Sequence, residues 1–227
     1  MKKFVAFTLA ETLIVMGVIG IVSALTLPNL NSSTGDKERV AKVKKIYQNL
    51  NDALGRAEAV YGPYDEWFIN DTTIAEKSKR AGERITEFMK LSKNCELNVN
   101  QGCCSSSWDT SPNDYKVITA DGTSLSFFVV ANDNNKFTIN ADIDGPAKGT
   151  STGGKDWFQF NYIDGEVRTN VKNETFTELV NLAYNKNSNA SFEWILRYDN
   201  ADYLKFKNAR GLCPNGTTVT EANPRCK

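Results

Sequence analysis

The sequence predicts an α+β fold in which a long N-terminal helix packs on an antiparallel β-sheet head, one half of the helix being membrane-spanning and the other amphipathic. Three observations predict it. An uncharged apolar run extends from Leu13 to Leu27, a helical stripe of apolar residues follows it, and alternating segments separated by Asp-Gly pairs come after that. With 227 residues, the chain is long enough for one soluble domain besides the N-terminal helix.

The apolar run is long enough to cross a membrane. Counted back to Phe4 it has 24 residues, and at about 1.5 Å per residue such a helix crosses a hydrocarbon core of roughly 30 Å. One carboxylate, Glu11, lies near its start. A charge inside such a span costs on the order of 2.5 to 3.5 kcal/mol on insertion scales, so we expect a partner to compensate for it.

The residues around Glu11 resemble the type IV prepilin signal. A basic leader with Lys2 and Lys3 precedes the small residue Ala6, and Phe7 and Glu11 stand where the family has its first and fifth mature residues. An ordinary secretory signal places its apolar region before the cleavage site instead. The resemblance implies cleavage by a prepilin peptidase between Ala6 and Phe7, N-methylation of Phe7, and a type IV pilin fold.

The resemblance also implies roles within the helix. Glu11 is expected to direct assembly by pairing with the α-ammonium group of a neighbouring subunit. Gly17, Gly20 and Pro28 stand where the family carries helix-weakening residues, and they imply flexibility there. Ala6 departs from the glycine that is more usual before the cleavage site. The alternative is a plain signal anchor with Glu11 near the membrane interface.

These expectations divide the chain into four parts. Residues 1–6 are the leader, 7–30 the transmembrane and filament-core helix, 31–62 its amphipathic continuation, and 63–227 the head. A polar stretch after Pro28 predicts a break between the two halves of the helix. The amphipathic half has apolar residues at spacings of three and four, namely Val40, Val43, Tyr47, Leu50, Leu54, Ala57 and Tyr61.

The head is predicted to begin with a second helix over residues 72–91 and to continue as an antiparallel meander. Alternating apolar residues predict strands at 115–120, 123–130, 136–142, 157–163 and 166–170. Asp-Gly pairs between the first two and the last two of these segments indicate tight turns. Residues 176–184 have helical spacing, whereas 192–198 fit either a strand or a helix.

Five cysteines follow a segment that would deliver the head across a membrane, so we expect disulfides. Cys213 and Cys226 enclose a tail that has too few apolar residues to hold its own shape, and this pair is the one we favour. Cys95 has two candidate partners, Cys103 and Cys104, and the sequence does not choose between them.

Three carboxylates, Asp142, Asp144 and Asp156, flank a glycine-rich loop between two predicted strands. The pattern is similar to a signature in pilin and pseudopilin heads, and the resemblance implies a Ca²⁺ site, since calcium takes six to eight oxygen ligands. The alternative is a structural turn, because Asp beside Gly is common in turns.

Composition argues against an enzyme. The chain has no histidine, and no phosphate-binding loop, dinucleotide fingerprint or nucleophile elbow is present. Its 27 basic and 27 acidic residues balance, so no overall charge recruits nucleic acid. The basic stretches at 42–45 and 205–210 are candidate nucleic-acid contacts, with solvated helix or loop faces as the alternative.

The expected function is that of a structural subunit of a type IV pilus or type II secretion pseudopilus. The expected partners are other pilin or pseudopilin subunits, a prepilin peptidase, the inner-membrane assembly platform and the membrane itself. The expected location is a single pass through the inner membrane with a periplasmic head, followed by the filament. Two alternatives stay open, a minor pilin of a DNA-uptake or adhesion pilus and a signal-anchored periplasmic binding domain.

Overall fold

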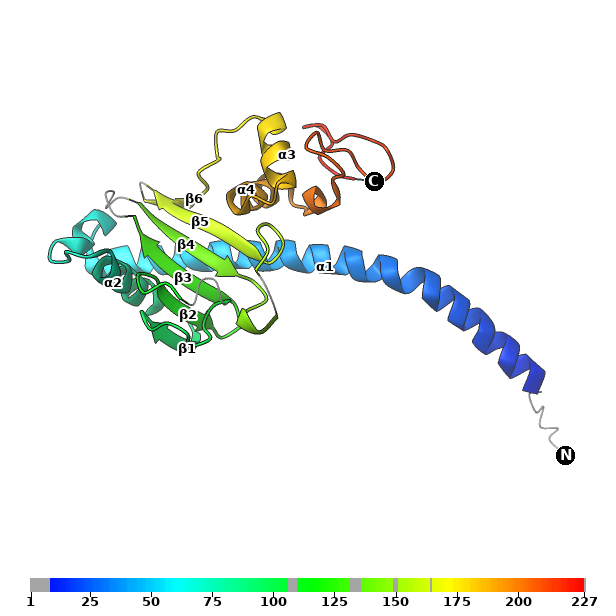
Figure 1. Cartoon of the computed structure of the whole chain (residues 1–227), viewed down its shortest axis with the longest axis horizontal. Helices are drawn as coiled ribbons and strands as arrows, with labels where there is room; N and C mark the ends of the chain where they lie inside the picture. Colours follow the sequence, from blue (N-terminus) through cyan, green and yellow to red (C-terminus); the bar gives the residue numbers. More distant parts are fainter. Residues whose placement is uncertain (1–8, 106–109, 131–135, 149–150, 164, 227) are drawn as a thin grey trace. The chain divides into compact units, whose positions relative to one another are not determined.

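The computed structural model describes residues 9–105, 110–130, 136–148, 151–163 and 165–226, apart from the side chains of residues 9, 11 and 22–34. The chain divides into two compact units, Met1–Glu38 and Arg39–Lys227. The six-stranded sheet and all helices after the first belong to the second unit (Figure 1).

The first helix, α1, runs from Leu9 to Tyr61 and therefore belongs to both units. The break predicted after Pro28 is wrong, because the helix continues through this residue and through the polar stretch that follows it. A proline inside a helix removes one backbone hydrogen bond and costs about 3 kcal/mol, but the turns on either side keep their own bonds.

The predicted fold is wrong in its membrane-spanning half. None of the helices in the described part of the chain is both long enough and apolar enough to cross a membrane. The predicted span was counted from Phe4, which lies outside the described residues, and polar residues from Asn29 onward end the apolar run within α1. The predicted location, a single pass through the inner membrane with a periplasmic head, is wrong for the same reason.

The helix also does not pack on the sheet as one element. Only its residues from Arg39 onward belong to the unit that contains the sheet. Within that unit the predicted apolar stripe is buried, and Ile46 and Ala53 belong to it as well. Tyr47 and Tyr61 are half-buried at the border of the core.

The sheet has six antiparallel strands, and their spatial order is their order in the chain. They are β1 (Leu91–Glu96), β2 (Tyr115–Thr119), β3 (Ser124–Val129), β4 (Lys136–Asp142), β5 (Trp157–Ile163) and β6 (Glu166–Arg168). The meander predicted from residue 115 onward is confirmed. The edge strand β1 was missed, and the second helix, α2, spans only Ile74–Thr86.

One face of the sheet forms the core. Leu125, Ala141 and Phe158 lie in register on neighbouring strands and are almost fully buried. The helix α2 comes close to this face, because a Cβ atom on Gly82 would lie 2.1 Å from the ring of Tyr115. Glycine at this position therefore permits the helix to approach strand β2.

The other face of the sheet is polar and nevertheless buried. Lys116 on β2 is fully buried, and its ammonium group donates to the carbonyl oxygens of Ser111 at 2.6 Å and Asn98 at 3.3 Å. Asn140 on β4 and Asn161 on β5 are at least nine-tenths buried on the same face. The described residues between β1 and β2 therefore help to cover it.

The chain ends in two helices, α3 (Phe176–Tyr184) and α4 (Ser188–Tyr198), and a polar tail. The helix predicted over 176–184 is confirmed as α3, and the ambiguous segment 192–198 is part of α4. Phe192 on α4 packs on Phe160 of β5, with ring centroids 4.3 Å apart. Shorter 3₁₀ segments are η1 (Tyr64–Phe68), η2 (Pro146–Lys148) and η3 (Asp202–Lys205).

Candidate functional site

The candidate assembly residues lie at the start of the chain. Ala6 and Phe7, the candidate cleavage and methylation residues, lie outside the described residues. Glu11 lies in the first turn of α1, but its side chain is not among those described. Pro28 lies inside α1 and its side chain is likewise not described.

Gly17 and Gly20 lie in the middle of the apolar part of α1. A Cβ atom built on either glycine would have no atom within 4 Å beyond the helix backbone itself. Neither glycine is therefore needed for a close approach by another described element. The flexibility assigned to these glycines rests on their low helix propensity alone.

The apolar residues beside these glycines are exposed. Seven large side chains between positions 13 and 21 have exposed fractions from 55 % to 73 %, namely those of Leu13, Ile14, Val15, Met16, Val18, Ile19 and Ile21. At 3.6 residues per turn these positions surround the helix on all sides. We call residues 13–21 the apolar segment.

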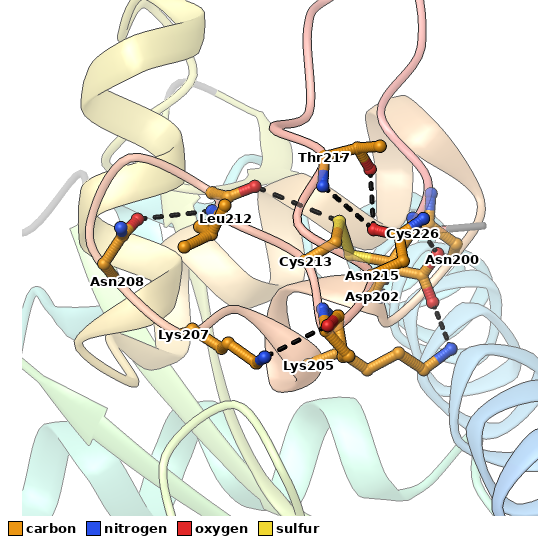
Figure 2. The surroundings of a disulfide bond; sticks show 12 residues. Asn200, Asp202, Lys205, Lys207, Asn208, Leu212, Cys213, Asn215, Thr217 and Cys226 are labelled. Atoms are coloured by element: carbon orange, nitrogen blue, oxygen red, sulfur yellow. Dashed lines mark hydrogen bonds and ion pairs between the residues drawn. A yellow bond between two sulfur atoms is a disulfide. The ribbon is translucent and has the colours of Figure 1, made fainter.

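The C-terminal tail is closed by a disulfide. Cys213 and Cys226, the pair that we favoured from the sequence, are joined in the structure (Figure 2). The backbone N–H of Cys226 donates to the Asp202 carboxylate at 2.9 Å, and Lys205 pairs with the same carboxylate at 2.5 Å. The disulfide and Asp202 therefore fix the tail to the segment η3.

A second disulfide joins Cys95 on β1 to Cys103. The sequence left the choice between Cys103 and Cys104 open. Cys104 lies outside both disulfides and is buried in one cluster with Cys95 and Cys103. The bridge ties the edge strand to the segment that covers the polar face of the sheet.

The carboxylates of Asp142 and Asp156 hold the backbone of the glycine-rich loop. One carboxylate oxygen of Asp142 accepts from the backbone N–H groups of Asp144 and Gly145, and the other accepts from Ser151 at 2.7 Å. A carboxylate oxygen of Asp156 accepts from the backbone N–H of Thr152. The bond from the Asp144 N–H to Asp142 is that of an Asx turn, whereas Asp156 accepts from a residue four positions before it.

The predicted calcium site at this loop stays a prediction. Within the described ranges, no group of three or more His, Cys, Asp or Glu side chains is placed to hold a metal ion. Burial raises the pKa of Asp142 to about 6, and the neighbouring Asp144 adds to the rise. Such a carboxyl takes up a proton more readily than an exposed one.

The two basic stretches make polar contacts within the second unit. In the first stretch, Lys44 pairs with Asp199 at 2.6 Å and Lys45 pairs with Asp121 at 2.8 Å. In the second, Lys207 donates to the carbonyl oxygen of Pro214 at 3.0 Å. These contacts match the alternative reading of both stretches as solvated faces of the fold.

Sequence reasoning missed a cavity of about 300 Å³ in the second unit. It is open to solvent on one side and is lined by residues 45–52 of α1, the junction 88–90 between α2 and β1, and the turn 119–121 between β2 and β3. Three segments far apart in the sequence supply its walls, so no local motif could have revealed it. We call this space the junction cavity.

No protein-family model, no curated protein and no solved structure matches this chain.

Proposed function

We propose that the chain is a structural subunit of a type IV pilus or type II secretion pseudopilus, and that it assembles through α1 after cleavage by a prepilin peptidase. Two observations support this proposal. The sequence places Ala6, Phe7 and Glu11 at the spacing of a prepilin signal, and the structure leaves the neighbouring apolar segment exposed.

The exposed apolar segment is the observation that carries the proposal. Burying one large aliphatic side chain contributes about 1.5 to 3 kcal/mol, and seven such side chains are more than half exposed here. A contiguous apolar surface of this kind marks an interaction site. Because the surface surrounds the helix, it requires neighbours on all sides, as identical helices packed in a filament core would provide.

Glu11 supplies the register in this proposal. Its carboxylate pairs with the α-ammonium group of Phe7 on a neighbouring copy, which exists only after cleavage. Removing one partner of a buried ion pair costs about 3 to 5 kcal/mol, because the other charge stays buried without compensation. Apolar packing then holds the helices together, and the ion pair fixes the axial displacement between neighbouring helices.

Cleavage is tested by co-expression with a prepilin peptidase, followed by intact mass measurement and N-terminal sequencing. The expected product begins at N-methylated Phe7. An Ala6→Lys variant, with a large charged residue before the cleavage site, should stay uncleaved. A chain that keeps Met1 in the presence of an active peptidase would remove the prepilin signal from the proposal.

Assembly is tested with Glu11→Leu in cells that build the filament. We expect this variant to be cleaved normally and to be absent from the sheared filament fraction. Thr12→Leu is the matched control, because it adds the same side chain at the next position and keeps the carboxylate. Normal incorporation of Glu11→Leu would contradict the register role, and absence of the cleaved wild-type chain from filaments would contradict the proposed function.

A further inference from the structure

We propose that the junction cavity binds a small amphipathic carboxylate, whose apolar part lies on Phe88 and Met89 and whose charged group lies beside Lys90. The cavity lies wholly in the second unit, so the proposal does not depend on assembly through α1.

The first carboxylate in the walls is fully engaged. Asp121 accepts from the ammonium group of Lys45 at 2.8 Å and from the hydroxyl group of Thr119 at 2.6 Å. Burial by itself raises the pKa of Asp121, but these two hydrogen bonds, the charge of Lys45 and a backbone hydrogen bond from Thr123 together lower the pKa to about 2. Asp121 is thus ionised and occupied, so it does not call for a cationic ligand.

The second carboxylate is also matched. Asp52 pairs with Arg56 one helical turn further along α1, at 3.1 Å. Lys90 is the remaining cation in the walls, and its ammonium group makes no hydrogen bond or ion pair with a described residue. The side-chain amide of Asn49 makes no hydrogen bond with a described residue either. The walls therefore offer donors and one positive charge, which favours an anionic ligand.

The apolar part of the walls comes from the junction between α2 and β1. Phe88 and Met89 are half-buried and pack against the core on their inner side. Backbone hydrogen bonds to Ile85 and Thr86 hold the two residues in place. A methionine thioether is adaptable and makes favourable contacts with aromatic rings, so an aromatic group suits this surface.

The volume limits the ligand. The cavity has a volume of about 300 Å³. This is the volume that about ten water molecules take up in the liquid, at roughly 30 Å³ each. A ligand of about ten heavy atoms therefore matches the cavity. A carboxylate attached to such an apolar group belongs either to a free small molecule or to the C-terminal residue of a peptide. The chemistry in the cavity is the same for both.

The experiment uses methionine methyl signals. The chain has three methionines, at positions 1, 16 and 89, so ¹³C-methyl labelling of the full-length protein in a non-ionic detergent gives few signals. A Met89→Leu variant assigns the signal from the cavity. Met16 lies in the exposed apolar segment and reports nonspecific partition of the probe into detergent.

The probe is 3-phenylpropionate, and its neutral amide is the matched control. We expect the Met89 signal to shift saturably with the carboxylate and at least about fivefold more weakly with the amide, as loss of a charge-assisted hydrogen bond predicts. Lys90→Gln should raise the dissociation constant by a similar factor. Lys93→Gln, the same change on the exposed edge strand, should leave it unchanged.

Three results would overturn the proposal. They are no shift at Met89, an equal response to the acid and the amide, and an unchanged dissociation constant in Lys90→Gln. The peptide N-acetyl-Gly-Gly-Phe, with a free or an amidated C-terminus, separates the two sources. Tighter binding of the free-acid peptide than of 3-phenylpropionate assigns the site to a peptide C-terminus, and weaker binding assigns it to a free carboxylate.

Discussion

Asp142 shows how one side chain can serve a turn and respond to pH. It ends strand β4 and is 6 % exposed, and its oxygens accept two backbone N–H groups and one hydroxyl group. Burial and the nearby Asp144 raise its pKa to about 6, against about 4 for an exposed aspartate. The folded chain therefore binds this proton more tightly than the unfolded chain does.

The stability contribution of Asp142 has a definite sign. It is fully present below about pH 4 and is lost as the pH rises through about 6. We expect the free energy of unfolding of the wild type to fall by on the order of 2 kcal/mol over this window, relative to Asp142→Asn. Denaturant titrations at several pH values measure the difference.

Asp144→Asn is the companion variant for this measurement. It removes the neighbouring charge and leaves the buried carboxyl in place, so the pH dependence should become smaller without vanishing. Parallel curves for the wild type and Asp142→Asn between pH 4 and pH 7 would show that this carboxyl does not respond as we expect.

At the residue scale, the sequence predicted which side chains lie close together, but it did not predict the contacts that they make. Asp142, Asp144 and Asp156 do belong to one loop, but the oxygens of Asp142 bind backbone N–H groups that no residue pattern specifies. The favoured pair Cys213 and Cys226 followed from the composition of the tail between them. The junction cavity could not be predicted, since its walls meet only after folding.

At the scale of elements, the alternation of apolar and polar side chains predicted the strands that turn an apolar face to the core. It failed for β1, whose sequence LSKNCE is mostly polar and whose pairing with β2 contains two register irregularities. An edge strand needs little apolar surface. The helix predicted over 72–91 ran too far because Phe88, Met89 and Leu91 continue the apolar spacing beyond Thr86.

The helix α3 depends on its first residue. Thr175 and Glu178 form a capping box, in which each side chain bonds to the backbone N–H of the other. We expect Thr175→Ala to lower the free energy of unfolding by about 1 kcal/mol. Thr177→Ala, an exposed site inside the same helix, should be neutral or slightly stabilising.

Thermal or urea unfolding of the two α3 variants measures this difference. Equal effects from Thr175→Ala and Thr177→Ala would mean that the capping box adds nothing beyond helix propensity.

At the scale of the whole molecule, two disulfides fix segments that have little core of their own. The bridge between Cys213 and Cys226 closes a separation of 13 residues, for which loop-closure entropy gives about 3 kcal/mol. We expect the double variant Cys213→Ser/Cys226→Ser to lose about this much free energy of unfolding. Urea unfolding under non-reducing conditions measures it.

The pair Cys95→Ser/Cys103→Ser provides the comparison for this loss, because it opens a shorter loop with a separation of 8 residues. Its loss should be slightly smaller on the same reasoning. A loss below about 1 kcal/mol for the variant in the tail would show that Asp202 and its hydrogen bonds hold the tail without the disulfide.

The order of the strands bears on how the chain is made. Each strand pairs with the next one in the sequence, so the sheet can grow one hairpin at a time, without waiting for a distant partner. The helix α1 emerges first, yet its buried stripe belongs to the same core cluster as strand residues that emerge much later. A growing chain therefore carries two uncovered apolar surfaces at once, this stripe and the apolar segment. Its greatest tendency to aggregate falls before β4 and β5 are complete.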